Sequence, residues 1–554
     1  MKGSYQTNRV FLSIFAFFHR FILICFFLLF SHVLFIYPQD FDARGEDQMA
    51  ERYALWAKNM MNNGQWKEAL AGLERAADFA NVSSDLSYLL AVARSHEKMP
   101  RLSVLEALEL ALVTDAWNEY SPDTARLMKA ENLIIIRAYA DALKELSRVP
   151  ASAEEAALTL KALMGSPAQF RAFLTATLDR YPREIAPVRI FFDFLKKENS
   201  RNWEIDSEPM PTAALREDLE LLDLINHRLP VLLLKDPELA WMAAPYMRDR
   251  DEARRLVLAY RAIYTPLPAS LPVSLHLGVI DDETALEELF KASLGKPVID
   301  IDLLAEIWGL LRREETRALF RRNLSSYTGV IIEDRDRDTI HEVSAEYFDG
   351  MITAYHYDAN QDGVPELSVQ FDAALPVRAE VAIPPDTSRE NPAGNAAVQW
   401  ERYPAIQEVE LDGVQYIPRP LDFHYSPLRF VDFNGSGFLF PLRDPLGAPL
   451  TRRVLVSNSI RVERPSLEFR GGMEVVEVNQ GIPVRAREYV GNMMVSETEF
   501  LRGRPQLQRV DLDFDGHMET VRHFSRNYRD MELEELWNYD RNVDYTYNQE
   551  GDGN

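Results

Sequence analysis

The sequence predicts an α+β protein in which helices and strands are segregated along the chain. Residues 1–40 combine a basic start with an apolar run, and residues 41–325 space their apolar side chains three and four apart. Residues 326–554 instead alternate apolar and polar side chains between turn signals. Because side chains repeat every 3.6 residues in a helix and every two in a strand, the change of period near Tyr327 marks a domain boundary. We therefore expect a signal-anchor helix, a helical-repeat α-solenoid and an antiparallel β-meander.

The composition is that of a folded and strongly acidic chain. Its 554 residues are 47% hydrophobic and carry a formal net charge of −25, enough chain for two or three domains. No nucleic-acid partner is expected, because the phosphate backbone attracts a basic surface. The single cysteine, Cys25, lies in the N-terminal apolar run. We therefore expect the rest of the chain to hold no disulfide and no cysteine-ligated metal.

The N-terminus predicts export. An apolar run at 21–37 follows Lys2, Arg9 and Arg20 and ends before the first acid, Asp40. This order is typical of an export signal whose own end stays in the cytoplasm. The run is at the short limit for a membrane-spanning helix, and no A-x-A cleavage site follows it. We favour an uncleaved signal-anchor over a cleaved signal peptide, which predicts a single-pass membrane protein whose bulk is periplasmic or surface-exposed.

The pattern from Gln48 to Phe79 predicts two amphipathic helices broken at Asn62-Asn63-Gly64. This stretch resembles a tetratricopeptide repeat, whose small, small, large and small positions are taken by Ala57, Ala69, Leu73 and Ala76. Poorer copies begin at Ser84 and at Thr124. The resemblance implies a solenoid whose concave face binds protein partners.

Helical spacing continues to about residue 325. The segments 215–224, 249–264, 281–294 and 302–324 all carry apolar residues three and four apart. Asp281 is expected to cap the third of these helices. Three prolines precede the segment 273–280, which we expect to be extended.

Short strands and two-residue turns are expected after residue 328. Asp349-Gly350 and Asp412-Gly413 favour type I′ hairpin turns, and later glycine turns recur every 9 to 12 residues. The polar stretch 384–404 is expected to be a long loop, and 423–462 carries few clear signals. A weak repeat aligns Met351, Met473 and Met493, and it is similar to the hairpin repeats of MORN-type and YwqK-like antitoxin proteins, which form open single-layer sheets.

Acidic loops with the template D-x-[DN]-x-D-G-x-x-E are the strongest motif of the C-terminal region. Two copies are complete, a third lacks only the glycine, and a fourth at 540–548 keeps only the first three acidic positions. The candidate ligands are Asp358, Asn360, Asp362 and Glu366; Asp511, Asp513, Asp515 and Glu519; and Asp334, Asp336, Asp338 and Glu342.

Oxygen ligands at alternate positions of a curled loop are what calcium requires, and glycine permits the sharp bend. The residues at loop position twelve are not acids, which argues against an EF-hand. The loops instead resemble the calcium loops of integrin-type FG-GAP and thrombospondin type 3 repeats, which implies calcium as a cofactor. The alternative is that they are plain turns, because Asp, Asn and Gly are common turn residues.

Two functions remain open. The first is an exported, membrane-anchored scaffold that binds proteins through its helical repeats and whose β-rich tail calcium stabilises. The second is an exported hydrolase with a metal or carboxylate site in the β region, where the histidines are His341, His356, His424, His517 and His523. No H-E-x-x-H, G-x-S-x-G or P-loop motif occurs, which favours the non-enzymatic protein without deciding the question.

Overall fold

The computed structural model describes residues 43–79, 83–201, 216–291, 297–335, 340–383, 394–433, 437–444, 450–524 and 543–548. The expected signal-anchor segment, residues 1–40, lies outside these ranges. No helix within them is long and apolar enough to cross a membrane. Two compact units are present, the first comprising residues up to 99 with 106–125 and the second 100–105 with 126–554.

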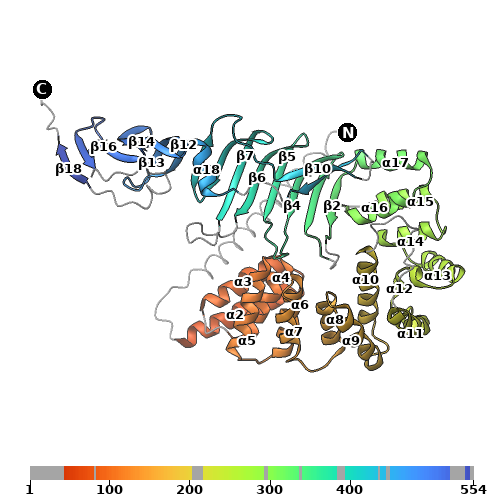
Figure 1. Ribbon diagram of the computed structural model, residues 1–554. Helices are drawn as coiled ribbons and strands as arrows, with labels where there is room; N and C mark the ends of the chain where they lie inside the picture. Colours follow the sequence, from red (N-terminus) through yellow and green to blue (C-terminus); the bar gives the residue numbers. More distant parts are fainter. Residues whose placement is uncertain are drawn as a thin grey trace, which may run out of the picture. The chain divides into compact units, whose positions relative to one another are not determined.

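Helices make up the first part of the chain and a large sheet makes up the second, as predicted (Figure 1). The helices are α2 (Ala43–Asn62), α3 (Trp66–Phe79), α4 (Ser84–His96), α5 (Arg101–Thr114), α6 (Pro122–Ile135), α7 (Tyr139–Leu146), α8 (Ala153–Leu163), α9 (Pro167–Arg180), α10 (Ala186–Arg201), α11 (Arg216–Leu232), α12 (Leu239–Ala243), α13 (Arg250–Ile263), α14 (Leu271–His276), α15 (Asp282–Lys291), α16 (Ile301–Leu310) and α17 (Glu314–Ser325).

The first helices form a helical-repeat region that resembles a tetratricopeptide array. Helix α3 packs against both α2 and α4. The four residues at the small, small, large and small positions are fully buried; they are Ala57, Ala69, Leu73 and Ala76. Gly72 lies so close to Trp56 that a Cβ there would come within 2.5 Å of the indole ring. Small side chains on these faces therefore permit the close approach of α2 and α3.

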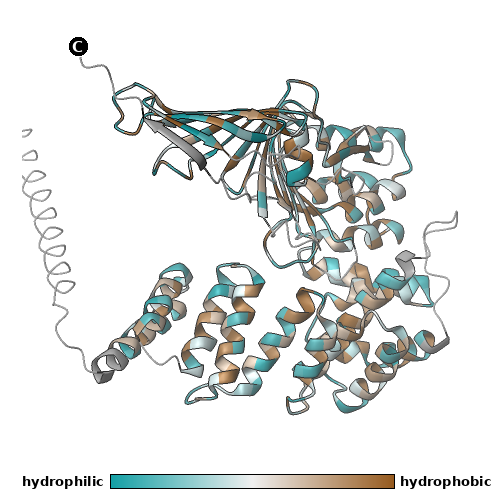
Figure 2. Cartoon of the chain, turned by 60° about the vertical axis from the view of Figure 1, so that its left-hand side comes forward, coloured by the Kyte–Doolittle hydropathy of each residue, from teal (hydrophilic) through white to brown (hydrophobic). Residues whose placement is uncertain are grey.

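The later helices each bury one apolar face, and Figure 2 shows apolar residues on one side of the helices and polar residues on the other. Asp281 caps α15 as expected, accepting a hydrogen bond from Thr284 N at 2.8 Å. The expectation of an extended segment at 273–280 was wrong, because helix α14 covers its first half. Pro272 lies in the first turn of α14, where a proline costs no hydrogen bond and its fixed φ suits the helix.

The β region is one open sheet in which neighbouring strands are almost always neighbours in sequence. Its order is β1-β2-β3-β4-β5-β6-β7-β8-β9-β12-β13-β14-β15-β16-β17-β18, and only β1 and β2 run parallel. A separate hairpin, β10–β11, and helix α18 are inserted between β9 and β12. The predicted antiparallel meander is confirmed.

The strand bounds follow the turn signals closely. They are β1 (Val298–Asp300), β2 (Gly329–Glu333), β3 (Val343–Phe348), β4 (Met351–Tyr357), β5 (Leu367–Asp372), β6 (Leu375–Ile383), β7 (Gly394–Arg402), β8 (Ala405–Leu411), β9 (Val414–Pro418), β10 (Leu428–Asp432), β11 (Leu439–Arg443), β12 (Ser459–Pro465), β13 (Met473–Asn479), β14 (Ile482–Val490), β15 (Met493–Leu501), β16 (Arg504–Val510), β17 (Thr520–Phe524) and β18 (Val543–Asn548), with α18 at Arg452–Asn458. Met351, Met473 and Met493 each begin a strand. The expected loop at 384–404 was wrong in its second half, which forms β7.

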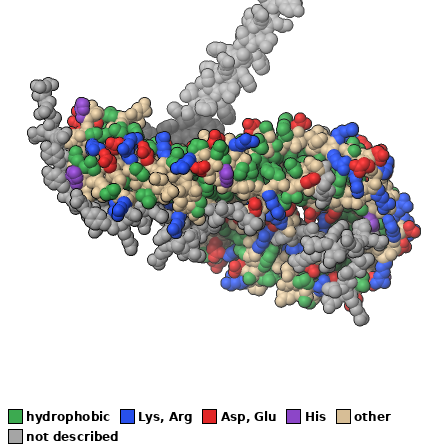
Figure 3. Space-filling model, turned by 45° about the horizontal axis from the view of Figure 1, so that its top comes forward, with side chains coloured by type: hydrophobic (Ala, Val, Ile, Leu, Met, Phe, Trp, Pro, Cys, Tyr) green, Lys and Arg blue, Asp and Glu red, His purple; other side chains and the backbone are tan. Residues whose placement is uncertain are grey.

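One face of the sheet forms the core with helices α14–α17, and its fully buried side chains include Tyr355 and Tyr416. The other face of β12–β16 carries a charge ladder. Arg487 lies 3.1 Å from both Glu477 and Glu497, and its Nη1 and Nε are the two donors. Figure 3 shows basic and acidic side chains intermixed over the surface that it presents.

Candidate functional site

The three acidic loops of the template lie at the same end of the strands. The Asp334 loop joins β2 to β3, the Asp358 loop joins β4 to β5, and the Asp511 loop joins β16 to β17. Successive strands in this run are antiparallel neighbours, and the excursion through β10, β11 and α18 returns to the edge it left, where Ser459 pairs with Pro418. The strands β2, β4 and β16 therefore run in the same direction, and the three loops that follow them lie at the same end of the strands although they are far apart in sequence.

The Asp511 loop gathers its four acidic side chains. One carboxylate oxygen each of Asp511, Asp513, Asp515 and Glu519 lie within 4.8 Å of one another. Asp511 is fully buried, whereas Asp513 and Asp515 are exposed. Four carboxylates at this spacing supply much of the oxygen shell of a calcium ion, which takes six to eight ligands including water. Of the histidine, cysteine and acidic side chains that the structure describes, no other group of three or more lies this close.

The Asp358 loop has the same backbone fold as the Asp511 loop. In both, the amide of position two donates to the glutamate at position nine, and the amides of positions five, six and seven donate to the side chains of positions three, one and five. In the Asp358 loop the distances are 2.6 Å (Ala359 to Glu366), 3.0 Å (Asp362 to Asn360), 2.8 Å (Gly363 to Asp358) and 2.8 Å (Val364 to Asp362). In the Asp511 loop they are 2.7 Å (Leu512 to Glu519), 3.3 Å (Asp515 to Asp513), 2.8 Å (Gly516 to Asp511) and 2.8 Å (His517 to Asp515).

Both loops also bend at the same two positions. Gln361 and Phe514, at position four, have φ of 57° and 63°, and the glycines at position six, Gly363 and Gly516, have φ of 87° and 94°. This region of φ disfavours side chains, which explains the glycine of the template. The template is thus a structural unit and not a chance clustering of acids.

In the Asp358 loop two of the candidate ligand side chains bond to each other. The Asn360 amide donates to Asp362 Oδ2 at 3.1 Å. Oδ1 of Asp358 is buried and accepts no hydrogen bond from the described residues. Burial raises the pKa of the Asp358 carboxyl, and the negative charges of Asp362 and Glu366 raise it further, against the lowering effect of the Gly363 amide. A cation at this loop would offset that unfavourable charge.

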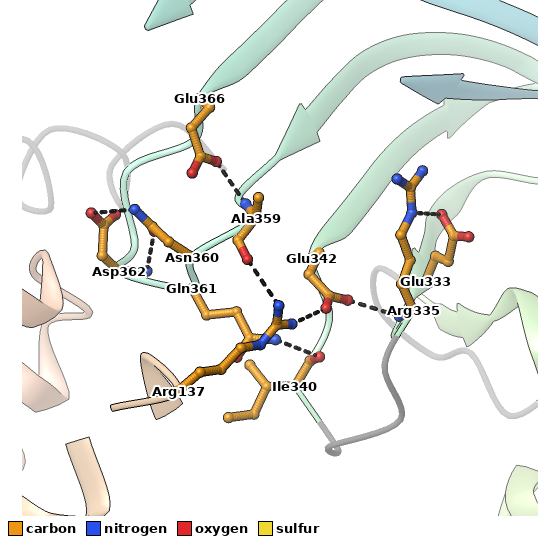
Figure 4. Close-up of polar contacts among 10 residues, drawn as sticks. All are labelled: Arg137, Glu333, Arg335, Ile340, Glu342, Ala359, Asn360, Gln361, Asp362 and Glu366. Atoms are coloured by element: carbon orange, nitrogen blue, oxygen red, sulfur yellow. Dashed lines mark hydrogen bonds and ion pairs between the residues drawn. The ribbon is translucent and has the colours of Figure 1, made fainter. Parts of the chain in front are cut away.

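The third loop is described only at its two ends, since Asp336 and Asp338 lie outside the described residues. Arg335 N donates to Glu342 Oε2 at 2.8 Å, which is the bond that closes the other two loops. The other oxygen of Glu342 pairs with the guanidinium of Arg137, which also donates to Ala359 O at 3.2 Å (Figure 4). The Asp334 and Asp358 loops are therefore joined through one arginine.

In the fourth sequence copy Asp544 and Asn548 belong to strand β18, and Asp540 and Asn542 lie outside the described residues. A different stretch, 432–437, is described only at its two ends and shares one hydrogen bond with the complete loops. Gly437 N donates to Asp432 Oδ1 at 2.8 Å, and Gly437 has φ of 81°, as at positions six and one of the complete loops. The six residues from Asp432 read D-x-N-x-S-G, so replacing the third acid by serine in the search pattern would have found it.

The histidines of the sheet region do not join the acidic cluster of the Asp511 loop. His356 Nδ1 lies 3.1 Å from Ser368 Oγ, which is the cross-strand neighbour of His356. A surface hollow of about 350 Å³ lies between α15 and α17 and is lined by Glu283, Glu287 and Glu315 with three uncharged residues. None of the loop ligands lines this hollow.

Comparison with known proteins gives no function. No protein-family model matches the chain. An uncharacterized protein of Treponema pallidum (strain Nichols) is 22% identical over 609 aligned positions, which cover 88% of this chain and 74% of the relative. A solved structure described as a functional characterization of pilF from Pseudomonas aeruginosa has a TM-score of 0.26 and 18% identity, and the match covers 45% of this chain and 96% of that chain. These values establish neither a family nor a shared activity.

Proposed function

We propose that this protein is an exported, membrane-anchored scaffold whose helical repeats bind protein partners and whose sheet binds calcium at the edge carrying the acidic loops. The observation that carries the calcium part is the set of four hydrogen bonds that the Asp358 and Asp511 loops share. A turn that needed only to reverse the chain would require two residues, as at Asp349-Gly350. The longer loop at Asp511 instead holds four acidic side chains with oxygens within 4.8 Å of one another.

The scaffold part has separate support. The fully buried residues at the small and large positions pack α2 against α3. The exposed faces of these two helices are not used in that packing. Paired helices of this kind present extended surfaces suited to binding protein chains. Export is supported by the basic and apolar order of residues 1–40, which would expose the loops to calcium outside the cytoplasm.

The first expected effect of calcium is a higher stability of the folded protein, which requires no partner. An ion that binds only the folded state raises the free energy of unfolding. The increase grows with the logarithm of the ratio of ion concentration to dissociation constant once that ratio is well above one. The carboxylates of the Asp511 loop repel one another when no cation is present, so binding also removes an unfavourable charge interaction.

Thermal unfolding of the full-length protein in calcium and in chelator tests this proposal. We expect a higher midpoint in calcium, and the difference should be smaller in the variant Asp511→Asn/Asp515→Asn. The matched control is Asp349→Asn, which changes an aspartate in a two-residue turn where φ is 49° and should leave the calcium response intact. An equal response in all three proteins would mean that the acidic loops are not the sites.

A further inference from the structure

The two carboxylate oxygens of the glutamate at position nine have different partners in these loops. One of its oxygens accepts the amide of position two and closes the loop, as Glu519 does for Leu512 and Glu342 does for Arg335. The second oxygen takes no part in that closure. In the Asp511 loop this glutamate lies with the three aspartates of the cluster. In the Asp334 loop the second oxygen already meets a cation, the guanidinium of Arg137.

Arg137 is held where it can make this contact. It lies in the turn between α6 and α7 with φ of 62°, and its amide donates to Ile134 O at 3.0 Å. The next amide, Ala138 N, donates to Leu133 O at 2.8 Å and fixes the same turn. The side chain then spans two acidic loops, because Nη2 pairs with Glu342 while Nη1 donates to Ala359 O.

The environment of Glu342 makes this pairing important. Its side chain is only 3% exposed, whereas that of Arg137 is 31% exposed. A carboxylate this deeply buried is strongly destabilising without a positive partner or several hydrogen bonds. The guanidinium of Arg335, whose amide closes this loop, is engaged by Glu333 at 3.0 Å. Arg137 therefore supplies the charge that Glu342 requires.

Two more bonds fasten the same region. Gln361, at position four of the Asp358 loop, is buried, and its Nε2 donates to Ile340 O at 3.1 Å. Arg101 N, at the start of α5, donates to Asp362 O at 2.5 Å. Helical and sheet segments that are far apart in sequence thus meet at these two loops, as Figure 4 shows for Arg137.

We propose that the guanidinium of Arg137 takes the place of a metal ion at Glu342, so that this glutamate fastens the α6–α7 turn to the sheet and does not serve as a calcium ligand. No lysine or arginine among the described residues forms an ion pair with the four acids of the Asp511 loop, so this cluster keeps its site for a metal ion. The assignment of the metal to one loop rests on the function proposed above, whereas the attachment through Arg137 does not depend on calcium.

A double-mutant cycle in chelator tests the attachment. Arg137→Met should lower the unfolding midpoint by several degrees, because it leaves Glu342 buried and unpaired. Adding Glu342→Gln should recover part of that loss, since no uncompensated charge remains. The control, Arg248→Met, removes an exposed arginine whose partner Asp223 is also exposed and should change the midpoint little. Strictly additive losses in the double variant would overturn the proposal.

Calcium stoichiometry, measured by titration calorimetry on the full-length protein, tests the assignment. Glu342→Gln should bind as many calcium ions as the native protein, and Asp511→Asn/Asp515→Asn should bind one fewer. Loss of a calcium ion in Glu342→Gln would overturn the proposal, because the Asp334 loop would then be a metal site. If neither the native protein nor any variant binds calcium, the calcium part of the proposed function is wrong. The double-mutant cycle in chelator still decides the role of Arg137.

Discussion

The amide of Gly516 lies 2.8 Å from Oδ2 of Asp511, and the amide of Gly363 lies 2.8 Å from Oδ2 of Asp358. In each loop this bond joins the first aspartate to the glycine at position six and so holds the backbone curled around the aspartate side chain. The glycine is needed for the backbone and not for space, because no atom lies within 4 Å of the position that a Cβ on Gly516 would take.

Gly516→Ala should therefore destabilise the protein by about 1 kcal/mol or more, since alanine is strained at φ of 94°. Chemical denaturation measures the change. The control is Gly309→Ala in helix α16, where a Cβ also has open space and φ is not positive. That substitution should stabilise the protein by roughly 0.5–1 kcal/mol, because alanine is the better helix former. Equal effects at both positions would contradict the role given to backbone conformation.

Asp358→Asn should raise the unfolding midpoint at pH 7 in chelator. The folded state raises the pKa of Asp358, so ionising this carboxylate costs stability as the pH rises through the folded pKa, and asparagine removes that cost. Below the unfolded pKa both side chains are neutral, and the two midpoints should converge. Unfolding curves from pH 3 to pH 8 measure this. A native protein more stable than the variant at pH 7 in chelator would contradict the prediction.

Arg171→Met should destabilise the protein strongly. Arg171 donates two hydrogen bonds to Asp218, at 2.7 and 2.9 Å, and stacks on Phe194, with less than a tenth of either charged residue exposed. Removing one partner of a buried pair costs about 3–5 kcal/mol. Denaturant unfolding of Arg171→Met and of Arg171→Met/Asp218→Leu measures it, and the double variant should be the more stable. A loss in the single variant no larger than that of an exposed pair would count against this account.

Gly72→Ala should weaken the packing of α2 on α3. The added methyl would come within 2.5 Å of Trp56 and 3.3 Å of Ala57, so the indole must move. Overpacking of this kind costs about 1–3 kcal/mol. Because Trp56 is 43% exposed, Trp56→Leu should relieve the clash when combined with Gly72→Ala. Circular dichroism melts of both variants test this, and an unchanged melt for Gly72→Ala alone would show that the ring gives way freely.

Local turn chemistry is why the meander could be predicted from the sequence. Asp349 and Gly350 have φ of 49° and 72°, and Asp412 and Gly413 have φ of 53° and 76°, as a type I′ turn requires. Two residues fixed each reversal, so strand order followed the chain. The acidic template was also legible, because its bonds join residues no more than seven positions apart.

The features that the sequence did not reveal depend on distant contacts. Strand β7 forms in a Pro- and Asn-rich stretch because β6 and β8 pair with it on both sides, which outweighs local composition. Arg137 and Glu342 are 205 positions apart, so no spacing rule connects them. The shared edge of the three loops became visible only after the strands between them were counted and paired.

The most direct test of the central claim is a calcium titration of the full-length protein beside Asp511→Asn/Asp515→Asn, followed by calorimetry. If the Asp511 loop is a calcium site, the native protein will bind one more calcium ion than the double variant, and Asp349→Asn will match the native protein. The same number of bound ions in the native protein and the double variant would contradict the claim and leave the Asp511 loop as a plain turn.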